Sequence, residues 1–257
     1  MKKHITAFFM AWGMFCAIPC PYRKWDEAAR GWMLVYLPVV GLLTGGIWAL
    51  LVWGFGALGY TGALAAAVLM AAPYLLTGFI HLDGFMDCCD AILSRRDLPE
   101  RQRILKDSHV GSFAVICVAL LFLGGFAAFG DMDFAASWPA FVLIPAVTRC
   151  NAVLAVQRIA PMHTSQYAGG FEKEKTRAQC VALLIELALL LLAAGFLAAY
   201  GRVAALAAVI LAGLVCQLCC CGASKNLGGM SGDISGFSIT LGELAGVAAM
   251  AVLGGFF

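Results

Sequence analysis

The chain has 257 residues, of which 62% are hydrophobic and only 12% are charged. Soluble domains are about half apolar and about a quarter charged, so the composition excludes an ordinary soluble protein and indicates an integral membrane protein that contacts the lipid bilayer. The formal net charge of +2 gives no indication of nucleic acid as a partner. Most of the eleven cysteines lie inside apolar runs, where cysteine behaves as a small hydrophobic residue.

In chain order, the first apolar segment is residues 5–19, which is short and ends in IPCP. Proline breaks a helix, and a crossing needs about 20 residues, so we predict a short interfacial or half-spanning helix there. Seven later segments are long and apolar enough to cross: residues 32–53, 60–80, 111–130, 138–158, 180–200, 203–221 and 239–257. The predicted fold is all-α, a polytopic membrane helix bundle of about seven transmembrane helices, forming a single integral membrane domain over residues 1–257.

The positions of the basic residues predict the orientation. Of the 17 Lys and Arg residues, 15 lie near the N-terminus or in alternate connections, at residues 20–31, 81–110, 158–179 and 222–238. The positive-inside rule makes this side cytoplasmic. We therefore expect the bacterial cytoplasmic (inner) membrane, with the N-terminus inside, the C-terminus outside and a site built on these connections facing the cytoplasm.

Three aspartates follow the second predicted span, in the sequence HLDGFMDCCD at residues 81–90. Asp83, Asp87 and Asp90 have spacings of four and three, which place them on one stripe of a helix. Carboxylates at this spacing repel one another, and a divalent cation would neutralise them. Ligands that are all oxygen favour Mg²⁺, Mn²⁺ or Ca²⁺ over zinc. The stripe therefore predicts a site for a divalent cation; the alternative is a solvated polar helix end.

A second polar group, KDSHVGS, precedes the third predicted span and contains Lys106, Asp107, Ser108 and His109. Phosphoryl transfer needs metal and cationic groups on the phosphates and a carboxylate that orients the attacking hydroxyl. We therefore predict that Lys106, Ser108 and His109 bind substrate and that Asp107 is a catalytic candidate.

A third polar group, NLGGMSGDISG at residues 226–236, precedes the last predicted span. Glycine clusters expose backbone N–H groups to anions, so Gly228, Gly229, Gly232 and Asp233 are predicted to bind substrate. A flexible connection between two spans is the alternative for the glycines.

Two further features lie inside predicted spans. Arg149 is costly in a membrane unless it faces a cavity or a partner, so it is predicted either to bind a phosphate group or to form a structural ion pair, for which Glu186 is a candidate. Gly41 and Gly45 in GLLTG have the spacing of small residues that let two helices approach closely.

The three polar groups, in this order, resemble the motifs of the cobalamin synthase family, and FCAIPCP with WDEAARGWMLVYLPVVGLLTGG resembles that family's N-terminal part. The resemblance implies a membrane enzyme with adenosylcobinamide-GDP ribazoletransferase activity. Such an enzyme joins adenosylcobinamide-GDP to α-ribazole or its 5′-phosphate and releases GMP, with Mg²⁺ as cofactor. It also implies that Asp83, Asp87 and Asp90 bind the metal.

For the mechanism, we expect Asp90 or Asp107 to orient or deprotonate the attacking hydroxyl, with His81 as a secondary catalytic candidate. Two other functions stay open from the residues alone. A CDP-alcohol phosphatidyltransferase-like enzyme has similar chemistry but the pattern D-x-x-D-G-x-x-A-R, which is not matched here. A cation-coupled carrier would place its acidic residues near the middle of the membrane. The sequence also leaves formation of a homo-oligomer open.

Overall fold

The computed structural model describes residues 2–163 and 176–254. These residues are helical apart from short connections. The helices are α1 (Lys2–Phe15), α2 (Glu27–Met33), η1 (Leu34–Tyr36), α3 (Leu37–Ala57), α4 (Ala63–Leu76), α5 (Ile80–Leu93), α6 (Leu98–Ile104), α7 (Ser112–Gly130), α8 (Phe134–Arg158), α10 (Arg177–Ala199), α11 (Val203–Leu227) and α12 (Gly232–Leu253).

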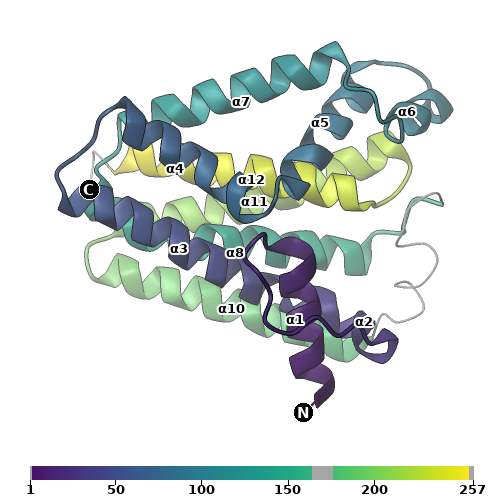
Figure 1. Cartoon of the computed structure of the whole chain (residues 1–257), viewed down its shortest axis with the longest axis horizontal. Helices are drawn as coiled ribbons and strands as arrows, with labels where there is room; N and C mark the ends of the chain where they lie inside the picture. The colour runs from purple at the N-terminus through teal and green to yellow at the C-terminus, as the bar shows by residue number, and fades with distance from the viewer. Residues whose placement is uncertain (1, 164–175, 255–257) are drawn as a thin grey trace.

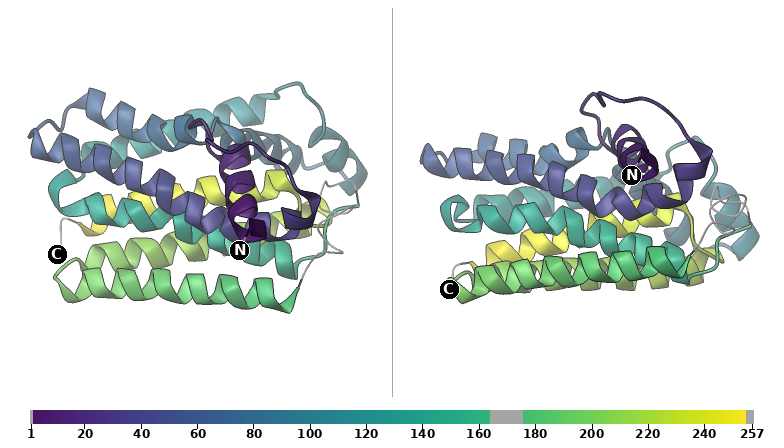
Figure 2. Two further views of the ribbon diagram at one scale, coloured as in Figure 1. Left: turned by 60° about the horizontal axis from the view of Figure 1, so that its bottom comes forward. Right: turned by 90° about the horizontal axis from the view of Figure 1, so that it is seen from below.

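The all-α membrane bundle is confirmed. Among the described residues, six helical stretches are long and apolar enough to cross a membrane, or seven if α4 and α5 together form one bent crossing. The long helices run alongside one another in Figure 1, with the short connections 58–62, 131–133 and 200–202 at one end. Helices α5 and α6 and the turn between α11 and α12 lie at the opposite end (Figures 1 and 2).

The second predicted span, residues 60–80, is not one straight helix. Helix α4 ends at Leu76, and α5 leaves at an angle of 93°. Gly78 and Phe79 both have positive φ, at 61° and 64°, and the Thr77 hydroxyl donates a 2.8 Å hydrogen bond to the Pro73 carbonyl. Because left-handed residues end a helix, the chain changes direction just before the acidic motif.

Helix α1 lies across the long helices rather than along them (Figures 1 and 2). Its 14 residues span about 21 Å, less than the roughly 30 Å of a hydrocarbon core. One face is buried, through Ala7, Met10 and Ala11. Its length and direction agree with the short interfacial or half-spanning helix predicted for residues 5–19.

Helices α3 and α8 pack with almost no space between their backbones. A Cβ atom added at Gly41 would lie 2.7 Å from the Pro145 carbonyl oxygen, and one at Gly45 would lie 2.5 Å from the Val142 carbonyl oxygen. The predicted close approach at these two glycines is confirmed. It brings the C-terminal half of α8 into the centre of the bundle, where α8 is buried along most of its length.

Candidate active site

The acidic motif is helical, as its spacing predicts. Helix α5 carries Asp83 in its first turn, with Asp87 and Asp90 one and two turns further on. Asp83 is exposed, whereas the other two are half-buried. The stripe therefore runs from the α4–α5 bend toward α6.

Two glycines hold this helix against the start of α12. A Cβ atom at Gly84 would lie 2.7 Å from the Asp233 carbonyl oxygen, and one at Gly236 would lie 2.9 Å from the His81 carbonyl oxygen. The Thr240 hydroxyl donates a 3.2 Å hydrogen bond to that same His81 oxygen. The first and third polar groups of the sequence are thus in direct backbone contact.

The glycine-rich group forms a tight turn followed by the beginning of a helix. Gly228, with φ of 81°, ends α11, and Gly229, with φ of 143°, packs against the backbone of Met162. The Ser231 hydroxyl accepts a hydrogen bond from the backbone N–H of Ile234, so α12 begins at Gly232 rather than at the predicted residue 239. Gly228 and Gly229 therefore shape the turn, whereas Gly232 and Asp233 lie in the first turn of α12.

Residues 160–162, which follow α8, pair with this turn as a short parallel bridge. The Met230 N–H donates to the Ala160 carbonyl at 2.9 Å, and the Met162 N–H donates to the Met230 carbonyl at 3.0 Å. This pairing fixes the end of α8 beside the start of α12. The side chains of the last turns of α8 therefore lie opposite the acidic motif.

A cavity of about 380 Å³ lies where these segments meet. Five of the predicted site residues line it: His81, Asp83, Lys106, Gly232 and Asp233. The remaining lining residues are mostly apolar: Met14, Phe15, Met33, Leu34, Leu37, Ile80, Leu105, Ala152, Val153, Val156, Met162, Ser231, Ser235 and Ile239. One cavity therefore receives residues from all three polar groups of the sequence.

The aspartates near this cavity form a concentration of negative charge. Asp87 lies close enough to Asp83, Asp233 and Asp90 for charge repulsion. Within residues 2–163 and 176–254, no three His, Cys, Asp or Glu side chains converge in a metal-binding arrangement. Mg²⁺ is usually bound by one or two carboxylates together with phosphates and water, and the all-oxygen donors at this position fit that requirement.

Asp90 has a structural role in addition to the roles predicted for it. Its carboxylate accepts hydrogen bonds from the backbone N–H groups of Gly111, at 2.7 Å, and Ala114, at 2.9 Å. A Cβ atom at Gly111 would lie 2.5 Å from this carboxylate. The side chain therefore caps α7, and its predicted metal and catalytic roles stay predictions.

Three residues of the second polar group, Asp107, Ser108 and His109, do not line the cavity. Asp107 accepts hydrogen bonds from the backbone N–H of His109 at 3.0 Å and pairs with its Nδ1 at 2.6 Å. These hydrogen bonds hold the pKa of the Asp107 carboxyl below its ordinary value. Ser108 and His109 are exposed. Of this group, only Lys106 lines the cavity.

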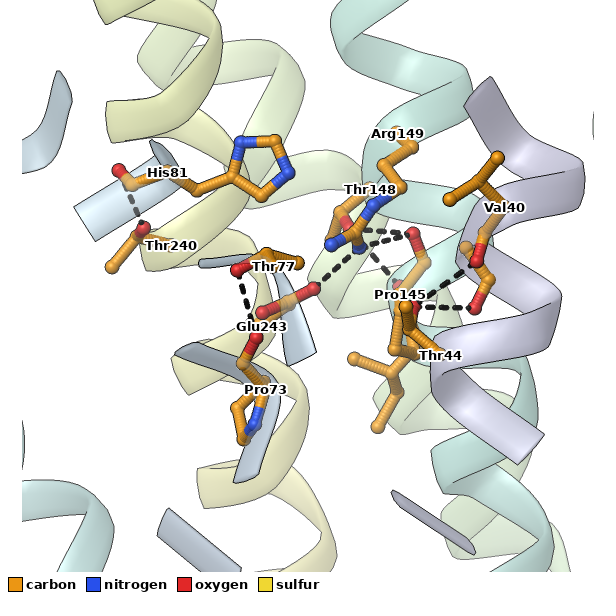
Figure 3. A network of polar contacts seen from close by, with 12 residues as sticks. Val40, Thr44, Pro73, Thr77, His81, Pro145, Thr148, Arg149, Thr240 and Glu243 are labelled. Carbon is orange, nitrogen blue, oxygen red and sulfur yellow. Dashed lines mark hydrogen bonds and ion pairs between the residues drawn. The ribbon is translucent and has the colours of Figure 1, made fainter. Parts of the chain in front are cut away.

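Arg149 is buried in the bundle and forms an ion pair. Its Nη1 atom lies 2.7 Å from Glu243 Oε1 and also donates to the Pro145 carbonyl at 2.9 Å. Figure 3 shows the guanidinium between Glu243 and Pro145, with the His81 ring turned toward it. Glu243, rather than Glu186, is the partner. The structural ion pair is thus present, and Arg149 does not line the cavity.

Most of the lining residues were not predicted, including those of α1 and α8. Helix α1 contributes Met14 and Phe15, and α8 contributes Val153 and Val156. The Phe15 ring stacks on the His81 ring, with centroids 6.3 Å apart and planes 14° apart. Apolar side chains in an apolar sequence carry no signal of their own, so only the packing reveals them.

The sequence profile of one family, described as cobalamin-5-phosphate synthase, matches residues 7–251. A protein of Clostridium botulinum (strain Alaska E43 / Type E3) named adenosylcobinamide-GDP ribazoletransferase is 36% identical over 251 residues, covering 96% of this chain and 97% of the relative. A protein of the same name in Clostridium perfringens (strain 13 / Type A) is 34% identical over 254 residues, covering 98% and 100%.

Another relative with this name, from Desulforamulus reducens, is 35% identical over 213 residues, covering 81% of this chain and 80% of the relative. No solved structure matches the chain. The family profile spans nearly all of the chain and includes every lining residue of the cavity. The chain therefore belongs to the cobalamin-5-phosphate synthase family.

Proposed function

We propose that this chain is an adenosylcobinamide-GDP ribazoletransferase. A ribose hydroxyl of α-ribazole, or of its 5′-phosphate, attacks the pyrophosphate of adenosylcobinamide-GDP at the phosphorus next to cobinamide. The new P–O bond replaces the bond to GMP, which leaves, and the hydroxyl proton is released. The product is adenosylcobalamin or its phosphate.

The observation that carries this proposal is the meeting of the three polar groups at one cavity. Asp83, Lys106 and Asp233 come from three separate segments and line it together. Phosphoryl transfer depends mainly on positioning and on neutralising the charge of the phosphates. A cavity that joins carboxylates with a lysine supplies both requirements.

We propose Mg²⁺ as the cofactor, held by Asp83 and Asp87 with Asp90 or Asp233 beside them. The fit rests on the crowded carboxylates: in the part of the chain that the structure describes, Asp83, Asp87 and Asp233 form no ion pair with a basic side chain. When bound, Mg²⁺ would neutralise negative charge on the phosphates of the substrate.

The protein's own residues would bind the substrate and handle the proton. The Lys106 ammonium can approach a phosphate as a mobile positive charge. Among the predicted proton acceptors, His81 is the one that lines the cavity. Asp90 accepts hydrogen bonds from the start of α7, and Asp107 accepts them from His109, so each of these carboxylates also has a structural partner.

We further propose that the protein lies in the bacterial cytoplasmic membrane with this cavity facing the cytoplasm. The basic residues of α6 and its flanking segments, including Arg96, Arg101 and Arg103, lie at the same end of the bundle as α5 (Figure 1). The positive-inside rule assigns that end to the cytoplasm, where nucleotide substrates are available.

The test is GMP release from adenosylcobinamide-GDP by purified protein, with α-ribazole and Mg²⁺ each added or omitted. We expect release only when all components are present. Asp83→Asn should lower the rate by about 100-fold, because the proposed Mg²⁺ loses a charged ligand. The matched control is Asp131→Asn, an exposed aspartate between α7 and α8 at the opposite end of the bundle.

Two outcomes would reject the proposal. One is the absence of GMP release by the intact chain in the presence of every component. The other is faster CMP release from a CDP-alcohol donor, which would identify a phosphatidyltransferase-like enzyme. Mg²⁺-dependent turnover without ion flux in vesicles would exclude the carrier.

A further inference from the structure

The charged and apolar residues of the cavity come from different parts of the fold. Its charged side chains all come from α5, the segment after α6 and the first turn of α12. Helices α1, α2, α3 and α8 and η1 contribute apolar side chains only: Met14, Phe15, Met33, Leu34, Leu37, Ala152, Val153 and Val156. The cavity therefore has one charged wall and one apolar wall.

The two walls also differ in exposure. Asp83, Lys106 and Gly232 are exposed, whereas Met33, Val153 and Ile239 are at most 2% exposed. Asp83 and Lys106 therefore lie at the opening of the cavity, together with the exposed Met14 and Ile80, and the buried apolar residues form its floor. A ligand that fits must be apolar at one end and polar at the other.

The size of the cavity selects between the two substrates of the proposed reaction. Pockets of about 300–1,000 Å³ hold ligands of drug size, and this cavity has about 380 Å³. A nucleoside such as α-ribazole is of this size. A corrin macrocycle joined to a guanine nucleotide is several times larger and cannot fit in the cavity as a whole.

The side chains that line the cavity also favour α-ribazole over the guanine nucleotide of the other substrate. Met14, Met33 and Met162 are flexible thioethers that make favourable contacts with aromatic rings, and the stacked Phe15–His81 pair adds a flat aromatic surface. The base of α-ribazole, dimethylbenzimidazole, is flat, aromatic and almost without polar groups. Against the apolar side chains that α1, α2, α3 and α8 contribute, a purine would bury ring nitrogens and an amino group without hydrogen-bond partners.

We propose that this cavity is the α-ribazole site, an assignment that rests on the proposed function. The benzimidazole base lies against the apolar floor, and the ribose lies at the opening beside Asp83 and Lys106. Adenosylcobinamide-GDP brings its pyrophosphate to the opening from outside. Helix α1 is then part of the binding site, because Met14 and Phe15 close one side of the cavity.

The first test fills the floor of the cavity. Val156→Phe should raise the KM for α-ribazole by about 10-fold or more and leave the KM for adenosylcobinamide-GDP unchanged. Val252→Phe is the matched control, since Val252 lies on α12, is 62% exposed and does not line the cavity. Isothermal titration with α-ribazole alone, in detergent, should show the same weakening of binding for Val156→Phe without any turnover.

Two further measurements test the proposal even if Val156→Phe does not fold. Phe15→Leu, a milder change, should weaken α-ribazole binding by removing the stack on His81. The unaltered chain should show a KM about 10-fold or more higher for the analogue with adenine in place of the benzimidazole, because its polar ring edge loses hydrogen bonds.

The proposal is overturned if Val156→Phe changes the KM for adenosylcobinamide-GDP instead, or if the purine analogue binds as well as α-ribazole. Failure of the proposed function itself looks different. In that case the intact chain releases no GMP with any acceptor, whereas titration still reports whether α-ribazole binds.

Discussion

Gly84 of α5 lies against the backbone of Asp233 in α12, so closely that a Cβ atom there would come within 2.7 Å of the Asp233 carbonyl oxygen. The change Gly84→Ala must push the two helices apart, at a cost of about 1–3 kcal/mol. We expect a loss of GMP release of about 10-fold or more, because the carboxylates of the two helices separate. Gly222→Ala is the control, since no neighbouring atom lies within 4 Å of a Cβ at that position in α11. Equal GMP release by Gly84→Ala and Gly222→Ala would contradict the inference that this contact between α5 and α12 positions the carboxylates.

A comparison of two substitutions at Asp90 should separate its structural role from its chemical role. Asp90→Ala removes both hydrogen bonds to the start of α7 and should lower the free energy of unfolding by about 0.5–2 kcal/mol. Asp90→Asn keeps one of the two acceptor oxygens, so one of the two hydrogen bonds and part of that stability should remain. Thermal unfolding in detergent and GMP release are measured together. Full activity of Asp90→Asn would remove Asp90 from the metal and catalytic assignments.

The Arg149–Glu243 pair should behave as a buried unit. Arg149→Met leaves the Glu243 carboxylate buried without its partner, which costs about 3–5 kcal/mol. The double change Arg149→Met with Glu243→Leu should recover much of that loss, because no uncompensated charge remains. A double variant that is as unstable as the single one would contradict a structural pair. A stable but inactive double variant would support the predicted substrate role of Arg149.

The hydrogen bonds from His109 lower the pKa of Asp107, so their stabilising effect is present above the ordinary pKa of an aspartate. It is lost as the pH falls through the lowered value. His109→Ala should move the Asp107 pKa upward, toward its ordinary value, as measured by NMR of a ¹³C-labelled carboxyl group. His163→Ala is the control, because this exposed histidine has no role in the Asp107 contacts. An unchanged titration in His109→Ala would reject these contacts.

Local and periodic features of this protein were predictable from the sequence. The helical stripe of Asp83 and Asp87 follows from their spacing, and the close contact of α3 with α8 follows from two glycines four residues apart. Both depend on a single helix, whose geometry is fixed by the number of residues in each turn.

Features that depend on which segments pack together were not predictable. The choice of Glu243 over Glu186 as the partner of Arg149 requires knowing which helices lie next to α8. The binding of Asp90 to α7 joins residues that are 21 positions apart. The apolar floor of the cavity likewise draws on helices from both halves of the chain, and no residue type in it differs from ordinary membrane-spanning sequence.

The 93° bend before the acidic helix also has a consequence for how the protein is made. Helix α4 has 14 residues, or about 21 Å of helix, and a hydrocarbon core is about 30 Å thick. On its own, this segment is too short for stable insertion as it leaves the ribosome. Contacts with two neighbouring helices stabilise α4. The Trp48 indole of α3 donates a 2.8 Å hydrogen bond to the Leu69 carbonyl of α4, and Gly125 of α7 packs on Met70 of α4. We therefore expect α4 to insert stably only together with α3, which is synthesised before it, and to complete its packing once α7 has been translated.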